Sequence, residues 1–161
     1  MERQAVANTS SLIFLAKLNL FSLAKNMFSQ IIIPKQVINE LFKKESEENI
    51  IIRNELQEFL KEIEINKVKE FPLDEGETAA ISLCLHKNIR TFLSDDKKAR
   101  KIARSFSLEN IGIIGIILWN FNNNKLQKKE AIEIINKLID KGYYISSSIY
   151  AKIMQLIQGT D

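Results

Sequence analysis

Two adjacent carboxylates, Asp95 and Asp96, separate a short apolar run from a strongly basic segment. The run, 91–93, predicts a buried strand, and the segment after the acids, 97–106, predicts a helix. In an α/β domain such a strand ends at the carboxyl edge of the sheet, where these folds bind ligands. Two acids there, beside a basic helix, are typical of a site that holds a divalent cation next to a phosphate backbone. Helix capping is the alternative, because Ser94 can cap and the helix dipole favours acids in a first turn.

Further candidate ligands lie where other predicted elements meet. Asn8 closes the first predicted strand, Glu40 lies on the polar side of a helix, and Glu77 lies in the first turn of another. Strand ends and helix starts of a parallel sheet converge on one edge, so these residues would form one acidic pocket with Asp95 and Asp96. Hard oxygen ligands suit Mg²⁺ or Mn²⁺ rather than zinc or copper. A pair of such ions can activate a water and stabilise the leaving oxygen of a phosphodiester.

Most of these residues also have a purely structural interpretation. Asp74 and Glu77 fit a capping box, and Glu40 fits an ordinary solvated helix residue. Cys84, on an apolar helix face, is typical of a core position rather than of a nucleophile. The single histidine, His86, has no partner in the sequence for a Ser-His-Asp or Cys-His arrangement. Nucleophilic catalysis of those two kinds is therefore not supported.

Strand and helix patterns alternate along the chain. Apolar and β-branched runs predict strands at about 4–7, 30–33, 64–68, 91–93 and 108–111. Caps and apolar periodicity predict helices at about 12–18, 20–28, 35–44, 47–63, 74–86, 97–106, 112–120, 128–141 and 146–158. Phe106 is expected to face inward. Buried strands alternating with helices predict an α/β fold, a three-layer α/β/α sandwich with a central parallel sheet.

The composition predicts one globular domain, 1–161, with the C-terminal helices at about 128–158 packing on it. The chain has 161 residues, 45% of them hydrophobic and 27% charged, enough for a core without disulfides. The single cysteine excludes an internal disulfide framework and a multi-cysteine zinc site, and fits a reducing compartment. A net charge of only +3 means that affinity for nucleic acid must come from local clustering. No apolar run reaches membrane-spanning length and the first residues lack a secretion signal, so we expect a cytoplasmic protein without a membrane partner.

Six segments of the chain, taken in order, resemble a family of PIN-like proteins. They are ANTSSLIFLAKL, IIIPKQVINEL, LDEGETAAISLCL, FLSDDKKARKIA, IGIIGIIL and GYYISSSIYAKIMQLIQG, and together they cover nearly the whole chain. Each motif is weak alone, but six in order are fairly specific. The resemblance implies an α/β/α ribonuclease that depends on Mg²⁺ or Mn²⁺, and many such proteins are toxins of toxin–antitoxin pairs. The expected partners are RNA, a cognate antitoxin and a second copy of the chain.

The resemblance also implies where the metal site lies. It places the ligands on Asn8, Glu40, Glu77 and the Asp95-Asp96 pair, without deciding which member of the pair ligates. The four acids are the expected catalytic residues. The expected nucleic-acid contacts are Lys97, Lys98, Lys101, Thr9 and Ser10.

One residue departs from the family pattern. PIN nucleases usually carry Asp where this chain has Asn8, whose amide oxygen can ligate a cation but brings no charge. A hard divalent ion held by fewer carboxylates binds more weakly. The alternative to a ribonuclease is therefore a PIN-fold module that has lost catalysis and binds RNA or protein. A phospho-acceptor domain fits least, because Asn8-Thr9 and Ile111-Gly112 supply neither the acid pair nor the lysine that it needs.

Overall fold

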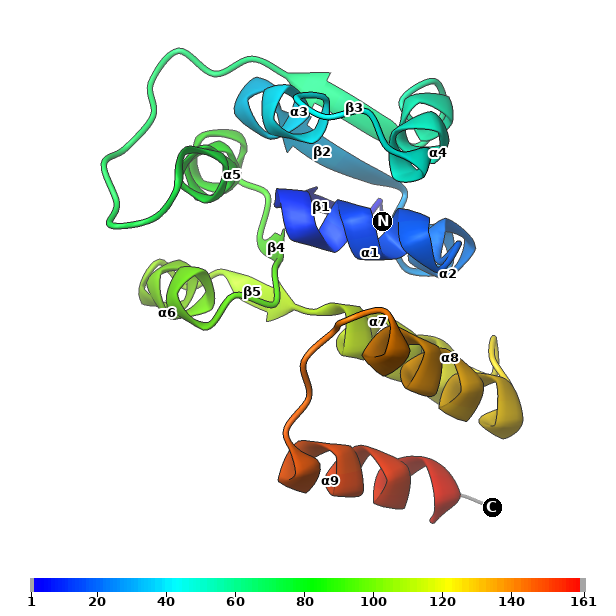
Figure 1. The fold of residues 1–161 in the computed structure, drawn as a ribbon. Helices are drawn as coiled ribbons and strands as arrows, with labels where there is room; N and C mark the ends of the chain where they lie inside the picture. Colours follow the sequence, from blue (N-terminus) through cyan, green and yellow to red (C-terminus); the bar gives the residue numbers. More distant parts are fainter. Residues whose placement is uncertain (1, 160–161) are drawn as a thin grey trace.

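The computed structural model describes residues 2–159, and its strands form one five-stranded parallel sheet (Figure 1). The strand order is β3-β2-β1-β4-β5. The strands are β1 (Gln4–Ala7), β2 (Gln30–Pro34), β3 (Leu60–Ile63), β4 (Thr91–Leu93) and β5 (Glu109–Ile111). The predicted central parallel sheet is confirmed.

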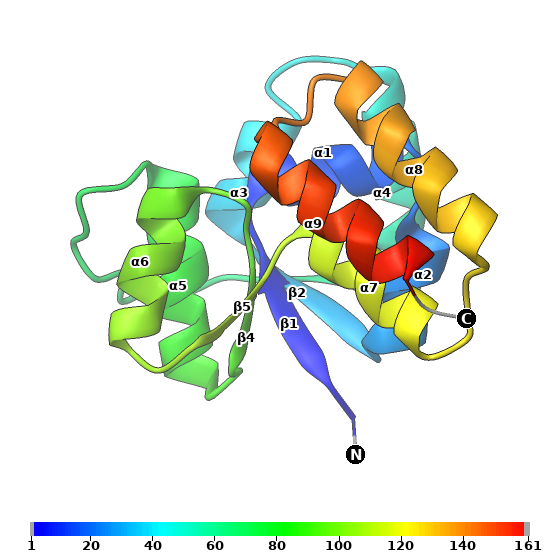
Figure 2. The same ribbon diagram turned by 90° about the horizontal axis from the view of Figure 1, so that it is seen from below.

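Helices cover both faces of this sheet. They are α1 (Thr9–Lys17), α2 (Phe21–Met27), α3 (Lys35–Leu41), α4 (Glu47–Glu55), α5 (Glu75–Lys87), α6 (Lys97–Ser105), α7 (Ile113–Asn122), α8 (Lys128–Asp140) and α9 (Ser147–Gln158). Figure 2 shows α5 and α6 on one side of the strands, and α1, α2, α7, α8 and α9 on the other. The predicted α/β/α architecture is therefore present.

The strands alternate their side chains between two apolar clusters. Val6, Ile32 and Phe92 point to the face that α5 and α6 cover. Ala5 and Ile31, one position earlier on their strands, belong to the larger cluster on the opposite face. Because successive strand residues point to opposite faces, a sheet covered on both sides needs apolar residues at every position. This explains why the strands read as continuous apolar runs.

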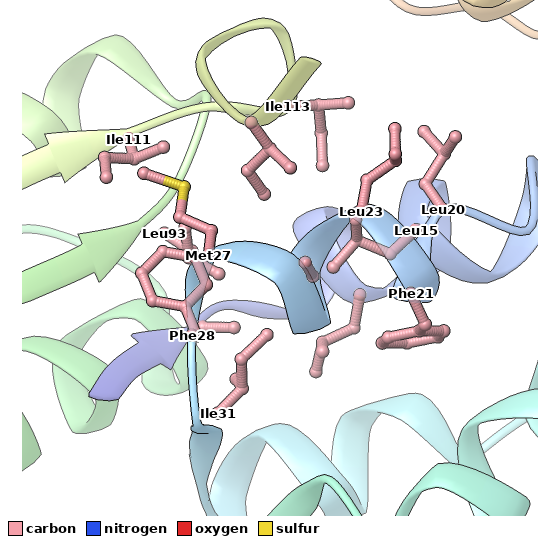
Figure 3. Close-up of a cluster of buried hydrophobic side chains, with 14 of the residues drawn as sticks. Leu15, Leu20, Phe21, Leu23, Met27, Phe28, Ile31, Leu93, Ile111 and Ile113 are labelled. Carbon is pink, nitrogen blue, oxygen red and sulfur yellow. The ribbon is translucent and has the colours of Figure 1, made fainter. Parts of the chain in front are cut away.

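The larger cluster joins the sheet to α1, α2 and α7. Figure 3 shows Phe28, Ile31, Leu93 and Ile113 in this cluster, with Met27 beside them. The cluster continues into α8 and α9, which contribute the buried residues Ala131, Ile135, Leu138, Ile153 and Ile157. The C-terminal helices are thus attached through apolar packing rather than through the sheet.

The strand order reverses between β1 and β4. From β1 the chain adds β2 and β3 on one side, then crosses to add β4 and β5 on the other. In open α/β sheets a crevice opens at such a switch point, beyond the carboxyl ends of the two strands. Asn8 follows β1 and Ser94 follows β4, so both flank this crevice.

The helix predicted at 47–63 and the strand predicted at 64–68 are wrong. Helix α4 ends at Glu55, and β3 begins five residues later at Leu60 and pairs with β2. Phe59 and Leu60 are buried as the sequence pattern required, but in the turn before the edge strand β3 and at its first residue, not on a helix. Their apolar spacing fits both structures, so pairing with β2 decides between them.

Several predicted helix boundaries also move. Helix α1 begins at Thr9 because the Asn8 side chain accepts a hydrogen bond from the Ser11 backbone N–H. Helix α3 ends at Leu41, not near residue 44. Phe106, expected to face inward, is 38% exposed and packs edge-on against Phe71.

Two further predictions from the sequence concern the position of Cys84 in the core and the absence of a membrane-spanning segment. Cys84 is buried, and its thiol donates to the backbone carbonyl of Thr91, which confirms a core position. Burial raises the pKa of this thiol to about 12, so it stays protonated and unreactive. Within residues 2–159, no helix is both long enough and apolar enough to cross a membrane.

Candidate functional site

A cleft of about 1120 Å³ lies at the switch point of the sheet. The predicted ligands Asn8, Glu40, Glu77, Asp95 and Asp96 all line it. The other lining residues are Thr9, Ser10, Ile13, Phe14, Met27, Asp74, Lys97, Arg100, Asn110, Ile111, Gly112, Ile114, Gly115, Trp119, Gly142, Tyr143, Tyr144, Ile145, Ser146, Ile149 and Ile153. The predicted ligands, of which Asn8 and Asp96 lie 88 positions apart in the sequence, thus line one cavity.

Asn8 is only 2% exposed and links the ends of β1 and β4. Its amide nitrogen donates to the Ser94 hydroxyl oxygen at 2.9 Å, and its amide oxygen caps α1 through the Ser11 N–H at 3.1 Å. The hydroxyl oxygen of Ser94 also accepts from the Asp96 N–H at 3.1 Å. Ser94 is therefore not the cap of α6 that the sequence suggested. It connects Asn8 to the acid pair.

The two adjacent aspartates have different partners. Asp95 accepts a 2.5 Å hydrogen bond from the Tyr143 hydroxyl on one oxygen and one from the Ile113 N–H, at 3.3 Å, on the other. Burial raises the pKa of Asp95, while these two donors and the nearby Arg100 lower it. Asp95 therefore joins β4 to the start of α7 and to the loop before α9.

Asp96 instead caps α6. Its Oδ1 accepts from the Ala99 N–H at 2.7 Å, and the side chain is exposed to the cleft. Burial and, after it, the charges of Asp74, Asp96 and Glu40 raise the pKa of Glu77. Asp96 thus faces the other acids of the cleft, whereas Asp95 faces Tyr143.

Glu40 is held at the cleft by its neighbours on α1 and α5. The Thr9 hydroxyl donates to Glu40 Oε2 at 2.9 Å. A Cβ placed on Gly76 would lie 2.6 Å from the same oxygen, so glycine gives the Glu40 carboxylate room beside α5. Thr9, expected to contact nucleic acid, lines the cleft and orients the Glu40 carboxylate. Ser10 is exposed at the cleft, with its hydroxyl 3.5 Å from Asn8 Oδ1.

Four carboxylates form what we call the acidic end of the cleft, namely Glu40, Asp74, Glu77 and Asp96. Desolvation, together with the charges of Asp74, Asp96 and Glu40, raises the pKa of Glu77 to about 7. Asp74 also caps α5, accepting from the Glu77 N–H at 2.7 Å, as the sequence predicted. No salt bridge of 4.0 Å or less joins these four to a basic side chain in the described part of the chain. The acidic end is thus a concentration of negative charge without a neutralising partner.

This donor set suits a hard divalent cation chemically, although it is not arranged as a finished metal site. Among residues 2–159, no three Asp, Glu, His or Cys side chains are grouped closely enough to hold a metal as they stand. Carboxylates that repel one another are expected to stay apart, and a divalent cation would draw them together. Glu40 and Glu77 have flexible side chains, so they can make that movement.

The opposite wall of the cleft is apolar and aromatic. We call Phe14, Trp119, Tyr143, Tyr144 and Ile149 the apolar end. Phe14 and Tyr143 pack edge to face with ring centroids 5.3 Å apart. Tyr144 and Ile149 are 82% and 52% exposed. This wall comes from α1, α7, α9 and the loop before α9, and Tyr143 connects it to Asp95.

The basic residues of α6 divide into two groups. Lys97 and Arg100 line the cleft, whereas Lys98 and Lys101 are exposed on α6 and do not line it. Arg100 is half-buried and acts on both Asp95 and Tyr143 through its charge. Of the three lysines predicted to contact nucleic acid, only Lys97 is therefore in the cleft.

Sequence reasoning missed Tyr143, Arg100 and the aromatic wall. Tyr143 lies in a Gly-Tyr-Tyr segment that serves, by pattern alone, only to separate two helices. Its contact with Asp95 spans 48 residues, and no local periodicity indicates such a contact. The available signal was composition, because adjacent tyrosines in a loop are typical of a binding surface.

Comparisons with known proteins agree with this geometry. Residues 4–159 match the model of the DUF3368 family, which is described as a PIN domain. No curated protein matches the chain significantly. Among solved structures, a PilT N-terminus domain protein from the hyperthermophilic archaeon Sulfolobus solfataricus P2 is similar, with a TM-score of 0.56 and 17% identity over 73% of this chain and 93% of that one. At that identity the likeness shows the fold alone. Because the family model spans nearly all of the sequence, the chain belongs to the PIN domain family.

Proposed function

We propose that this chain is a Mg²⁺- or Mn²⁺-dependent endoribonuclease that hydrolyses RNA phosphodiesters at the cleft. The observation that carries the proposal is the acidic end, four carboxylates at the sheet switch point with no basic partner among the described residues. When bound, a divalent cation supplies an activated water and stabilises the leaving oxygen.

Each residue at the acidic end has a defined part in this proposal. Glu40, Glu77 and Asp96 are the residues that would hold the cation, and Thr9 orients Glu40 through its hydroxyl. Asp74 fixes the start of α5 and so the position of Glu77. Asp95, with both oxygens engaged by Tyr143 and by the Ile113 N–H, positions the cleft wall. Lys97 attracts the phosphate backbone at the mouth of the cleft.

A specific observation favours a second candidate, a PIN-fold binding module without catalysis. Asn8 lines the cleft, and both polar atoms of its amide are engaged, with Ser94 and with the Ser11 N–H. Asn8 has no negative charge to offer a cation, and its hydrogen bonds stabilise the fold. In this second function the cleft binds RNA and leaves it intact.

The test is cleavage of a labelled single-stranded RNA of mixed sequence with Mn²⁺ and with EDTA. The proposal predicts Mn²⁺-dependent cleavage, lowered on the order of a hundredfold or more in Asp96→Asn and Glu40→Gln, because the acids hold the cation. Glu75→Gln is the matched control, since Glu75 is exposed on α5 and does not line the cleft. Cleavage that survives both substitutions would refute the assignment.

Asn8→Asp separates the two candidates. Asp caps a helix as well as Asn does, so α1 is preserved. Without metal, the added carboxylate should repel Glu40 and Asp96 and lower the melting temperature. With Mn²⁺ it becomes a further oxygen ligand and should raise metal affinity and cleavage. Tighter Mn²⁺ binding with no cleavage, in a chain that still binds RNA, would favour the binding module.

Protein partners are a further part of the proposal. We expect a cognate antitoxin, with this chain as the toxin, and a homodimer. Tyr144 and Ile149 offer exposed apolar surface beside the cleft for a protein contact. Light scattering over a range of concentrations tests self-association, and a monomer throughout that range would remove the homodimer.

A further inference from the structure

Arg100 carries an unsatisfied cationic side chain inside the cleft. Its Nε is fully buried and has no hydrogen-bond partner, and no carboxylate lies within 4.0 Å of its guanidinium among residues 2–159. Leaving a buried donor unpaired lowers stability, most of all for a charged group, and native proteins leave few of them. A guanidinium that lines a cleft and has no ion-pair partner among the described residues is a candidate for binding an anion, which can be tested.

A second unpaired atom lies on the same cleft. Asn110 Oδ1 is also buried without a partner, and Asn110 and Arg100 are both lining residues. The amide nitrogen of Asn110 points to the backbone oxygens of Arg100 and Leu108, at 3.4 and 3.3 Å. Turning the amide over would place its oxygen against these two carbonyl oxygens, so the present orientation is the favourable one. Two residues of the cleft wall, on neighbouring elements, thus each have a buried polar atom without a partner.

The place of Arg100 is set by the residues around it. It lies one turn into α6, where its backbone N–H donates to the carbonyl oxygen of Asp96 at 2.9 Å. Its charge lowers the pKa of Asp95 and of Tyr143, so its guanidinium lies near that pair without forming an ion pair with it. Arg100 therefore belongs to the part of the cleft between the acidic end and the Tyr143 wall.

We propose that Arg100 binds a phosphate group of the polynucleotide within the cleft and so determines where the strand lies relative to the acidic end. The planar guanidinium matches phosphate oxygens with two parallel hydrogen bonds, which an ammonium cannot do. The terminal nitrogens of the guanidinium would make these bonds, because the Nε is covered by protein. Lys98 and Lys101 lie outside the cleft and contribute only general attraction. This inference rests on the proposed function for the identity of the ligand as RNA.

The chain offers a matched control in Arg104. Arg104 is one further turn along α6, is exposed, and does not line the cleft. Arg100→Gln and Arg104→Gln remove the same charge from the same helix. Arg100→Lys keeps the charge but loses the planar guanidinium. It still tests the proposal if the Arg100→Gln variant fails to fold.

The experiment is binding of a labelled single-stranded RNA by anisotropy, in Ca²⁺ so that it does not depend on cleavage. Arg100→Gln should weaken binding about tenfold or more, and Arg100→Lys should fall between it and the wild type. Arg104→Gln should change affinity by less than about threefold, as for one screened surface charge. Equal losses in the two Gln variants, or none in Arg100→Gln, would overturn the proposal.

Two further arms separate the sources of failure. Inorganic phosphate should compete with the RNA only weakly, and competition as strong as that of RNA itself would assign the site to a free phosphate and overturn the polynucleotide. Cleavage is measured in parallel with Mn²⁺. Wild-type RNA binding that depends on Arg100 without any cleavage would keep this inference and refute the nuclease. Cleavage with unchanged KM and kcat in Arg100→Gln would refute this inference and keep the nuclease.

Discussion

The two ends of the cleft are built in opposite ways. At the acidic end, charged side chains converge from the ends of elements, and burial together with the charges of its neighbours raises the pKa of Glu77 to about 7. At the apolar end, rings pack on one another and the chief polar group, the Tyr143 hydroxyl, is paired with Asp95. The carboxylates of the acidic end have no basic partner among the described residues, whereas the Tyr143 hydroxyl at the apolar end has a hydrogen-bond partner.

This difference favours the acidic end as the place where a ligand binds and the apolar end as the part that maintains the shape of the cleft. Unneutralised carboxylates lower stability, so a fold that keeps them together gains when a cation binds. The Tyr143–Asp95 contact does the reverse, because it stabilises the fold by fastening the loop before α9 to the sheet edge. Substitutions should therefore have opposite effects on stability at the two ends.

The largest effect should come from Gly112→Ala, which acts on the connection between the two ends. A Cβ at Gly112 would lie 2.1 Å from Asp95 Oδ1, so the carboxylate would have to leave Tyr143. We expect a loss of about 2–3 kcal/mol in the free energy of unfolding, from overpacking and a broken, partly buried hydrogen bond. Urea denaturation measures it.

Gly115→Ala is the matched control for that loss. Its added Cβ would meet only the Ile111 side chain, at 3.1 Å, and alanine favours the helix. A change within about 1 kcal/mol is expected, because the two effects offset each other. Equal losses in the two variants would show that the Asp95 contact is not what Gly112 protects.

Tyr143→Phe should have the next largest effect. It keeps the ring against Phe14 but removes the hydrogen bond to Asp95, which should cost about 1–2 kcal/mol. The pKa of Asp95 should rise further, because one of the donors that lower it is gone. Tyr144→Phe, at an 82% exposed position, should leave thermal stability unchanged. If the Tyr143 variant is equally unaffected, the contact does not hold the loop before α9.

The smallest effect, with the opposite sign, should come from Glu77→Gln. The folded-state pKa of about 7 lies above the ordinary value of 4.5, so the folded state retains a proton that the unfolded state has lost. Wild-type stability should therefore fall as pH rises from about 4.5 to 7, relative to the variant. At pH 8 without metal, the variant should be more stable by about 1 kcal/mol after allowing for solvent screening. Thermal melts across this pH range check it, and a variant that is less stable at pH 8 would contradict the electrostatic account.

Much of the acidic end could be predicted from the sequence, because its residues occupy ends of elements. Asp96 follows β4 closely and caps α6, and Asp74 caps α5; parallel strands with their connecting helices bring such positions to one edge. The different parts played by Asp95 and Asp96 could not be predicted. They depend on Tyr143 reaching across the cleft from a distant loop.

The fold was also largely predictable from the sequence. The prediction of individual elements failed where the local apolar pattern fits both a helix and a strand. Strands β1, β2 and β4 are apolar at nearly every position, as a sheet covered on both faces requires. Strand β3 lies at the edge and has the pattern Leu-Lys-Glu-Ile, which also suits a helix turn. Only its pairing with β2 determines its structure, and that pairing is not visible in a local window.

The central claim, that the acidic end is a divalent-cation site, is tested most directly by calorimetric titration with Mn²⁺ at pH 8. The wild-type chain should bind Mn²⁺. Glu77→Gln should weaken that binding by about tenfold or more, because it removes one carboxylate and its negative charge from the site. Glu75→Gln, an exposed neighbour on α5 that does not line the cleft, should bind Mn²⁺ like the wild type. The account is contradicted if the wild type shows no Mn²⁺ binding, or if the Glu77 and Glu75 variants bind it equally well.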